Sequence, residues 1–165
     1  MAEKKLTTAE RGKFKKIIHA ALYKNDDLRE LLIGNTTGKS AKEVRDMFKA
    51  HVQSHLFIEE TLKDEASFIF YDVRIPEIHS HIKRCIVLMY AICHRSILED
   101  YAKEGYYGDR SDAMSQMIED ALLNNHETSN EFGIGELKLI DVDIYNSSRF
   151  YGSVMTFEVP NFRVG

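Results

Sequence analysis

The sequence predicts an α+β fold in which N-terminal helices precede a mostly antiparallel or mixed β-sheet, with a helix packed on one face and a C-terminal β-hairpin. Two observations lead to this prediction. Apolar residues recur at helical spacing in the first third of the chain and again after residue 110. Segments typical of strands follow one another without an intervening helix, which favours an antiparallel or mixed sheet over a doubly wound one.

Length and composition indicate one soluble globular domain, residues 1–165. The chain is 44% hydrophobic and 29% charged, and no apolar run approaches the roughly 20 residues of a membrane-spanning helix. We expect residues 1–39 to form a helical N-terminal extension and residues 40–165 to form the α+β core. The net charge of −4 argues against general nucleic-acid binding, which needs a basic surface. Early basic residues are interpreted as a solvated helix face: Lys4, Lys5, Arg11, Lys13, Lys15 and Lys16.

Two helices are predicted in the N-terminal extension. Thr7 begins a capping-box motif, "TTAE", which predicts a helix over residues 8–23. The apolar residues of "DDLRELLI" predict a second, short helix that Asp26 or Asp27 caps and Gly34 ends.

The segment "IGNTTGKS" is close to a phosphate-binding loop but departs from it in two ways. Gly34 and Gly38 bracket three residues, one fewer than the motif requires. A predicted helix rather than a strand precedes the segment, and Ser40 with Glu43 forms a capping box for a third helix. We interpret the segment as a helix end, a loop and a helix start; a small nucleotide-using enzyme is the alternative.

Two strands are predicted between residues 66 and 94. "ASFIFYDVRI" places Phe68 and Phe70 on one face and Ile69 and Tyr71 on the other, and Pro76 is expected to end the strand. "IKRCIVLMYAICH" is apolar on both sides, which predicts a central strand buried on both faces.

A last helix and a hairpin follow. Asp109 or Ser111 can cap a helix whose apolar residues recur at spacings of three and four. The polar stretch from Asn124 to Gly135 is expected to be a loop. Alternating residues on either side of positions 146–149 predict the C-terminal β-hairpin.

Histidines could form a metal site. His51 and His55 have the spacing that lets two imidazoles share a metal on one helix face, with His79 or His81 as further ligands. A metalloprotease helix needs a glutamate directly after the first histidine, where this chain has Val52. Surface histidines at a helix end are the favoured interpretation, and a metal-dependent enzyme remains an alternative.

The predicted hairpin carries a pair of carboxylates. Asp141 and Asp143 lie on the same face of one strand and could hold magnesium, but no further acidic or basic partner is marked in the sequence. We favour a solvated strand face, opposite the face that carries Ile140, Val142 and Ile144.

No catalytic motif is present. Cys85 and Cys93 lie eight residues apart in one extended segment, outside any C-x-x-C motif, and are expected to be buried thiols. The serines occur without G-x-S-x-G. We therefore expect no enzyme activity, no catalytic residue, no metal and no cofactor.

Two stretches carry a resemblance to a known family: "HRSILEDYAKEGYYGDRSDAMSQMIEDALLN" and "FGIGELKLIDVDIYNSSRFYGSVMTFEVPNF". The chain resembles neck proteins of tailed bacteriophages, in particular the tail terminator (tail-completion, head-tail joining) type. In that family, a phrase like Gly108 to Asp112 opens the helix before the hairpin. A phrase like Phe150 to Gly152 begins the last strand.

This resemblance implies a structural virion protein. It implies a homo-oligomeric ring, six-fold in tail terminators, that caps the tail tube, contacts the tail-tube and sheath proteins, and joins the tail to a head-side neck or adaptor protein. DNA would pass the lumen without specific binding. The implied location is the neck of the virion, after assembly in the bacterial host cytoplasm. The helical start departs from the terminator pattern, so a head-side adaptor or head-closure protein is an alternative, as is a protein-binding module without a ring.

The resemblance brings no catalytic residues, but it indicates candidates for subunit contacts near the two matched motifs. The charged candidates could equally be solvated, and the aromatic ones could equally pack in the core. The candidates are Tyr106, Tyr107, Asp109, Arg110, Arg149, Phe150 and Tyr151.

Overall fold

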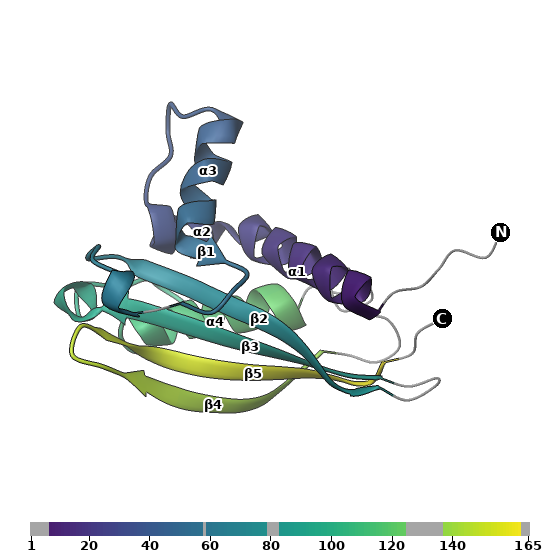
Figure 1. The fold of residues 1–165 in the computed structure, drawn as a ribbon. Helices are drawn as coiled ribbons and strands as arrows, with labels where there is room; N and C mark the ends of the chain where they lie inside the picture. The colour runs from purple at the N-terminus through teal and green to yellow at the C-terminus, as the bar shows by residue number, and fades with distance from the viewer. Residues whose placement is uncertain (1–6, 58, 79–82, 125–136, 163–165) are drawn as a thin grey trace.

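Four helices and a five-stranded sheet make up the fold (Figure 1), which confirms the predicted α+β class. The computed structural model describes residues 7–57, 59–78, 83–124 and 137–162. The elements are α1 (Thr7–Lys24), α2 (Asp26–Ile33), α3 (Ala41–His51), β1 (Val52–Gln53), η1 (Glu59–Thr61), β2 (Ser67–Ile78), β3 (Lys83–His94), η2 (Arg95–Ile97), α4 (Arg110–Leu123), β4 (Lys138–Asn146) and β5 (Phe150–Phe162).

The sheet has the strand order β1-β2-β3-β5-β4. The two-residue strand β1 pairs parallel with β2, and every other pairing is antiparallel, so the sheet is mixed. Strands β4 and β5 form the predicted C-terminal hairpin, and β3 is the central strand, as its apolar sequence predicted. This order places β4 at one edge of the sheet and β1 at the other.

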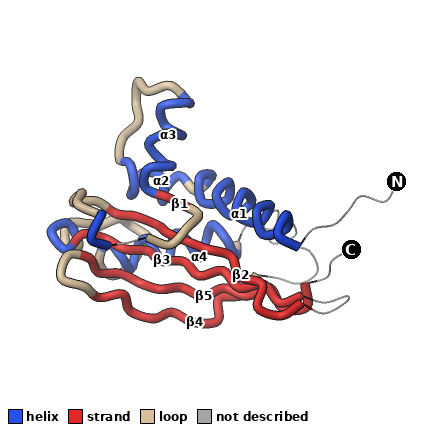
Figure 2. Tube along the Cα trace, viewed as in Figure 1, coloured by secondary structure: helices blue, strands red, loops and turns tan. Residues whose placement is uncertain are grey.

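Helices α1, α2 and α4 pack against one face of the sheet, whereas α3 adds Phe48 to the same core and projects beyond β1, as Figure 2 shows with helices in blue and strands in red. Helix α1 lies along β2, and α4 packs against β3 and β5. The helices and this face share one hydrophobic core, so α1 and α2 from the predicted extension are part of the same unit as the sheet. Helix residues in this core include Phe14, Ile18, Leu22, Leu28, Leu31, Phe48, Met114, Met117 and Ile118.

The opposite face of the sheet carries only a small apolar cluster. Its buried members are Phe68, Phe70, Ile92 and Phe150, and side chains from the segment around η1 pack onto them. The predicted division of β2 into a Phe68 face and an Ile69 face is therefore confirmed.

Strand β3 is buried less evenly than its sequence predicted. Its odd-numbered residues from Cys85 to Cys93 are all buried in the main core, whereas Ile86, Leu88 and Tyr90 on the other face are only half-buried. The prediction of burial on both faces was wrong over most of the strand, because among the described elements only the short segment around η1 packs on the second face. Both cysteines are free and buried, and burial raises the pKa of each thiol.

Strand β2 continues past the proline that was expected to end it. It runs to Ile78, and its register with β3 shifts between Arg74 and Glu77, with Pro76 inside the irregular stretch. A proline lacks a ladder donor, and a bulge accommodates that lack without ending the strand.

The helix starts also differ in part from prediction. The side chain of Asn25, rather than Asp26 or Asp27, accepts from the backbone N–H of Leu28 and caps α2. Ser40 caps α3 as predicted, and Asp109 caps α4 through a capping box. The predicted loop from Asn124 to Gly135 lies almost wholly outside the described residues.

Gly152 allows the close approach of β3 and β5. A Cβ at this position would lie 1.9 Å from the backbone oxygen of Ala91, too close for any side chain. We predict that Gly152→Ala lowers the free energy of unfolding by roughly 3 kcal/mol in a urea titration. The matched control Gly12→Ala, in exposed helix with no atom within 4 Å of the new Cβ, should raise it by roughly 0.5–1 kcal/mol. Equal effects at the two sites would contradict this account.

Candidate functional site

The loop that resembles a phosphate-binding motif is built from turns. It follows helix α2, and Gly34 and Gly38 both have positive φ. The side chain of Asn35 accepts from the backbone N–H and hydroxyl of Thr37, at 2.9 and 2.6 Å, and Ser40 then caps α3. The interpretation as a helix end, a loop and a helix start is confirmed.

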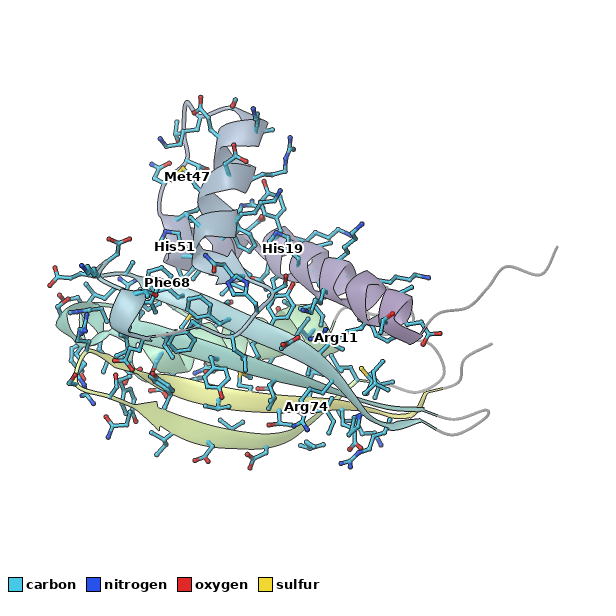
Figure 3. The ribbon with its side chains drawn as sticks, in the orientation of Figure 1. Arg11, His19, Met47, His51, Phe68 and Arg74 are labelled. Atoms are coloured by element: carbon cyan, nitrogen blue, oxygen red, sulfur yellow. The ribbon has the colours of Figure 1, made fainter. Side chains whose placement is uncertain are left out.

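The two histidines with metal-ligand spacing do not share a helix face. His51 is the last residue of α3, and His55 lies beyond β1. The His51 ring stacks on Phe68 with ring centroids 5.2 Å apart, and its Nδ1 lies 2.9 Å from the carbonyl oxygen of Ser67 (Figure 3). His79 and His81 lie outside the described residues, and the described part of the chain holds no group of three metal-ligating side chains.

The loop before α4 holds four of the predicted interface residues, and three of them have intramolecular roles. The hydroxyl of Tyr106 donates to Asp27 at 2.5 Å, and Asp109 caps α4. Arg110 donates to the carbonyl oxygens of Ile97 and Leu31, and its guanidinium lies over the Tyr101 ring. The fourth candidate in this stretch is Tyr107, and its side chain is exposed.

The other three candidates lie at the start of β5. Phe150 is fully buried in the small cluster, and Tyr151 packs against the main core with the Arg95 guanidinium 5.6 Å from its ring centroid. The Arg149 side chain donates to the carbonyl oxygen of Leu62 at 3.1 Å.

The segment around η2 joins these two groups of candidates. The backbone N–H of Arg95 donates to the carbonyl oxygen of Arg149, and that of Arg110 donates to the carbonyl oxygen of Leu98. The two groups of candidates, near the start of α4 and at the start of β5, therefore lie on either side of the segment around η2. Tyr107 is the candidate most available to a partner, since its side chain is 82% exposed.

Strand β4 presents an open, apolar edge that the sequence analysis did not single out. Ile140, Val142 and Ile144 are 47, 54 and 66% exposed. Val142 lies opposite Met155 of β5, so it shares the sheet face that the helices cover. Helix α4 packs on β3 and β5, however, and the row on β4 lies beyond it.

The two aspartates of β4 are also exposed, on the opposite face of the strand. Neither Asp141 nor Asp143 forms an ion pair with any residue that the structure describes; Asp143 accepts only from the backbone N–H of Ile144. The predicted solvated face is confirmed, but the apolar face of the same strand is solvated as well.

The other edge of the sheet is closed by helix α1. Arg11 donates to the carbonyl oxygen of Val73 at 2.6 Å, so a side chain occupies an acceptor that an added strand would use (Figure 3). Asp72 forms ion pairs with Arg11 and Lys15 at 2.6 and 3.0 Å. Burial opposes ionisation of Asp72, but the hydrogen bonds from Lys15, Val73 and Arg11 outweigh it and lower its pKa. Such blunting of edges is how proteins prevent unwanted strand pairing.

A cavity of about 580 Å³ lies between α1, α3 and β1. Among the described residues that line it, none is acidic and four are permanent cations. Ala20, Tyr23, Val52 and Tyr71 contribute apolar surface. The cations are Lys15, Lys16, Arg45 and Lys49.

His19 lies at this cavity, labelled in Figure 3, with its ring edge-on to Phe48. Burial lowers its pKa, and the nearby Lys49 lowers it further, so the ring is neutral at neutral pH. The sequence offered a partial signal for the cavity, since Arg45 and Lys49 stand four residues apart on one predicted helix. The packing of α3 beside α1 had no signal, because tertiary contact decides it.

A family model, described as YomW, matches residues 18–159, which is most of the chain. The chain belongs to the YomW family. This is a phage-derived family, so the protein is phage-associated, in agreement with the bacteriophage resemblance of its sequence. The YomW match begins inside α1 and includes β4 and most of the residues that line the cavity, while Lys15 and Lys16 precede it. No curated protein and no solved structure matches the chain. Among the described helices, none combines the length and apolarity of a membrane span.

The Tyr106–Asp27 hydrogen bond gives a pH-dependent prediction. The Tyr106 hydroxyl and Lys103 stabilise the carboxylate and lower the pKa of Asp27. Replacing Tyr106 by Phe should reduce the free energy of unfolding by at most roughly 1 kcal/mol at pH 7, because Asp27 is partly exposed.

A carboxyl group with a lowered pKa contributes stability that is present above its unfolded pKa and is lost as the pH falls through the folded value. The difference between wild type and Tyr106→Phe should therefore begin to shrink near pH 4 and vanish only below the lowered pKa of Asp27, in urea titrations across pH. Tyr107→Phe, at an 82% exposed side chain, serves as the control and should match wild type throughout. A Tyr106→Phe difference that persisted at low pH would contradict the assignment.

Proposed function

We propose that this protein is a structural component of the bacteriophage neck. In this proposal it forms a homo-oligomeric ring of six copies that caps the tail tube and joins the tail to the head. The observation that carries the proposal is the open β4 edge, with its exposed row of Ile140, Val142 and Ile144. The phage-derived family and the tail terminator resemblance of the sequence support it.

The physical argument rests on the difference between the two sheet edges. An exposed, apolar edge strand is a template for pairing with another chain, and monomeric proteins blunt such edges with charges, bulges or covering elements. This chain closes its β2 edge with Arg11, whereas β4 carries two aspartates and a register irregularity at Ile140, and its apolar side chains stay exposed in the described structure. An edge of this kind suits a protein that must bind copies of itself or a neighbouring protein.

The proposed partners are the tail-tube and sheath proteins on one side and a head-side neck or adaptor protein on the other. The protein would act without catalysis or cofactor, and DNA would pass through the ring. The acidic net charge of −4 supports passage rather than binding. Assembly would take place in the bacterial host cytoplasm, and the mature location would be the virion.

A head-side adaptor or head-closure protein is the second candidate. The observation that favours it is the integration of α1 and α2 into the main core, through residues such as Ile18 and Leu28. The shorter terminator pattern has no such helical start.

Native mass spectrometry of the protein, alone and with its cognate tail-tube protein, tests the proposal. A hexamer, alone or only with the tube protein, is the expected result, and a twelve-fold species would favour the head-side candidate. A monomer in both conditions that carries stoichiometric zinc or nucleotide would contradict a structural role.

An edge variant sharpens this test. Val142→Lys should abolish the oligomer while changing the free energy of unfolding by less than about 0.5 kcal/mol, because the side chain is exposed. Tyr107→Lys is the control, at an 82% exposed side chain in the loop before α4, and should assemble normally. An intact oligomer in Val142→Lys would exclude the β4 edge as the contact.

A further inference from the structure

Two unpaired surfaces of opposite charge lie on opposite sides of the molecule. One is the β4 edge, and the other is the cavity between α1 and α3, beside β1 at the far edge of the sheet. Figure 1 shows β4 along one side of the fold and α3 projecting from the other. Each surface combines apolar area with charges: the cavity is lined by four cations, and β4 carries two aspartates and one lysine, Lys138.

The cavity surface has cations without partners. Lys15 is already paired with Asp72, but Lys16, Arg45 and Lys49 form no ion pair within the described chain. All three are exposed. Its accessible apolar area comes from side chains such as Ala20 and Tyr23, so the cavity suits a partner that is both apolar and acidic.

The β4 edge has the complementary composition. Val142 and Ile144 lie on one flank of the strand, and Asp141 and Asp143 lie on the other. A surface that approaches this edge meets both rows at once, because successive side chains point to opposite faces. The edge therefore presents an apolar row and two unpaired carboxylates together.

Pairing of β4 with β4 of a second copy is disfavoured by charge. An antiparallel pairing that keeps the apolar rows on one face and centres on Val142 opposite its own copy sets Asp141 opposite Asp143. Like charges directly opposite each other in a sheet are destabilising. Addition to the other edge of a second copy is blocked where Arg11 occupies the carbonyl oxygen of Val73.

We propose that the β4 edge of one copy docks into the cavity between α1 and α3 of the next copy. Asp141 and Asp143 meet Lys16, Arg45 and Lys49, while Val142 and Ile144 contact the apolar cavity wall. The contact joins two different surfaces, so it is head-to-tail and generates a ring when the rotation closes. This inference rests on the proposed ring and specifies the contact that builds it.

Thiol cross-linking tests the contact directly. With a short bis-maleimide reagent, the double variant Val142→Cys/Arg45→Cys should give a ladder of covalent oligomers that ends at the ring. Each single variant should give none, and a mixture of the two single variants should give only dimers. Cys85 and Cys93 are buried, so the wild type serves as the unreactive control. Covalent dimers from Val142→Cys alone would show β4–β4 pairing and overturn the proposal.

Charge reversal provides a second measurement that does not depend on cross-linking. Asp141→Lys/Asp143→Lys and Arg45→Glu/Lys49→Glu should each weaken self-association by roughly tenfold or more. Mixed one to one, the two variants offer one contact with the native charges and one with the charges exchanged, and should restore an oligomer in which the two variants alternate. Circular dichroism and urea titration of each variant check that it is folded.

The outcomes separate this inference from the proposed function. If the wild type forms a ring and both charge-reversed variants form the same ring, the head-to-tail contact is wrong and the proposed ring is retained. A wild type that stays monomeric, alone and with the tail-tube protein, would overturn both. A mixed oligomer restored from the two charge-reversed variants, together with the cross-linked ladder, would support both.

Discussion

The one-sided covering of the sheet is the constraint on which the rest of this structure depends. Helices α1, α2 and α4 pack on one face, and the main core that they form reaches β4 through Leu139 but leaves Val142 and Ile144 exposed. The odd-numbered residues of β3 from Cys85 to Cys93 therefore lie in a full core, whereas Ile86, Leu88 and Tyr90 on the other face are only half-buried and Ile92 is buried in the small cluster. The same limit leaves the apolar row of β4 in solvent. The exposed edge thus follows from the width of the helix layer.

Helix α1 contributes both to the core and to the protection of one edge. Its apolar residues, such as Ile18, pack on the sheet. Arg11 and Lys15 form ion pairs with Asp72, and Arg11 also donates to the carbonyl oxygen of Val73 in β2. Its remaining basic side chains, together with those of α3, surround the cavity. A protein with an acidic net charge therefore carries a local basic surface, opposite an edge that is locally acidic. This polarity is what a head-to-tail assembly requires.

Most elements could be predicted from the sequence, because capping motifs and periodicity are local. The helix starts at Ser40 and Asp109, the hairpin and the central position of β3 are examples. Prediction failed where tertiary structure decides: Pro76 lies within a strand because a bulge accommodates it. The candidate site was the least predictable part. Alternation in β4 showed which residues share a face, but not that the helix layer stops short of that face. The basic residues of α1 were interpreted from the sequence as a solvated helix face, because no local pattern shows that α3 lies beside them.

Hydrogen–deuterium exchange, compared between dilute monomer and assembled protein, tests most directly the claim that β4 and the cavity form the assembly contact. The account predicts that assembly slows exchange in two separate peptides, one spanning β4 and one spanning the start of β1 with the end of α3. Unchanged exchange in β4, with protection confined to the loop around Tyr107, would contradict it. That result would place the contact at the motifs before α4 instead.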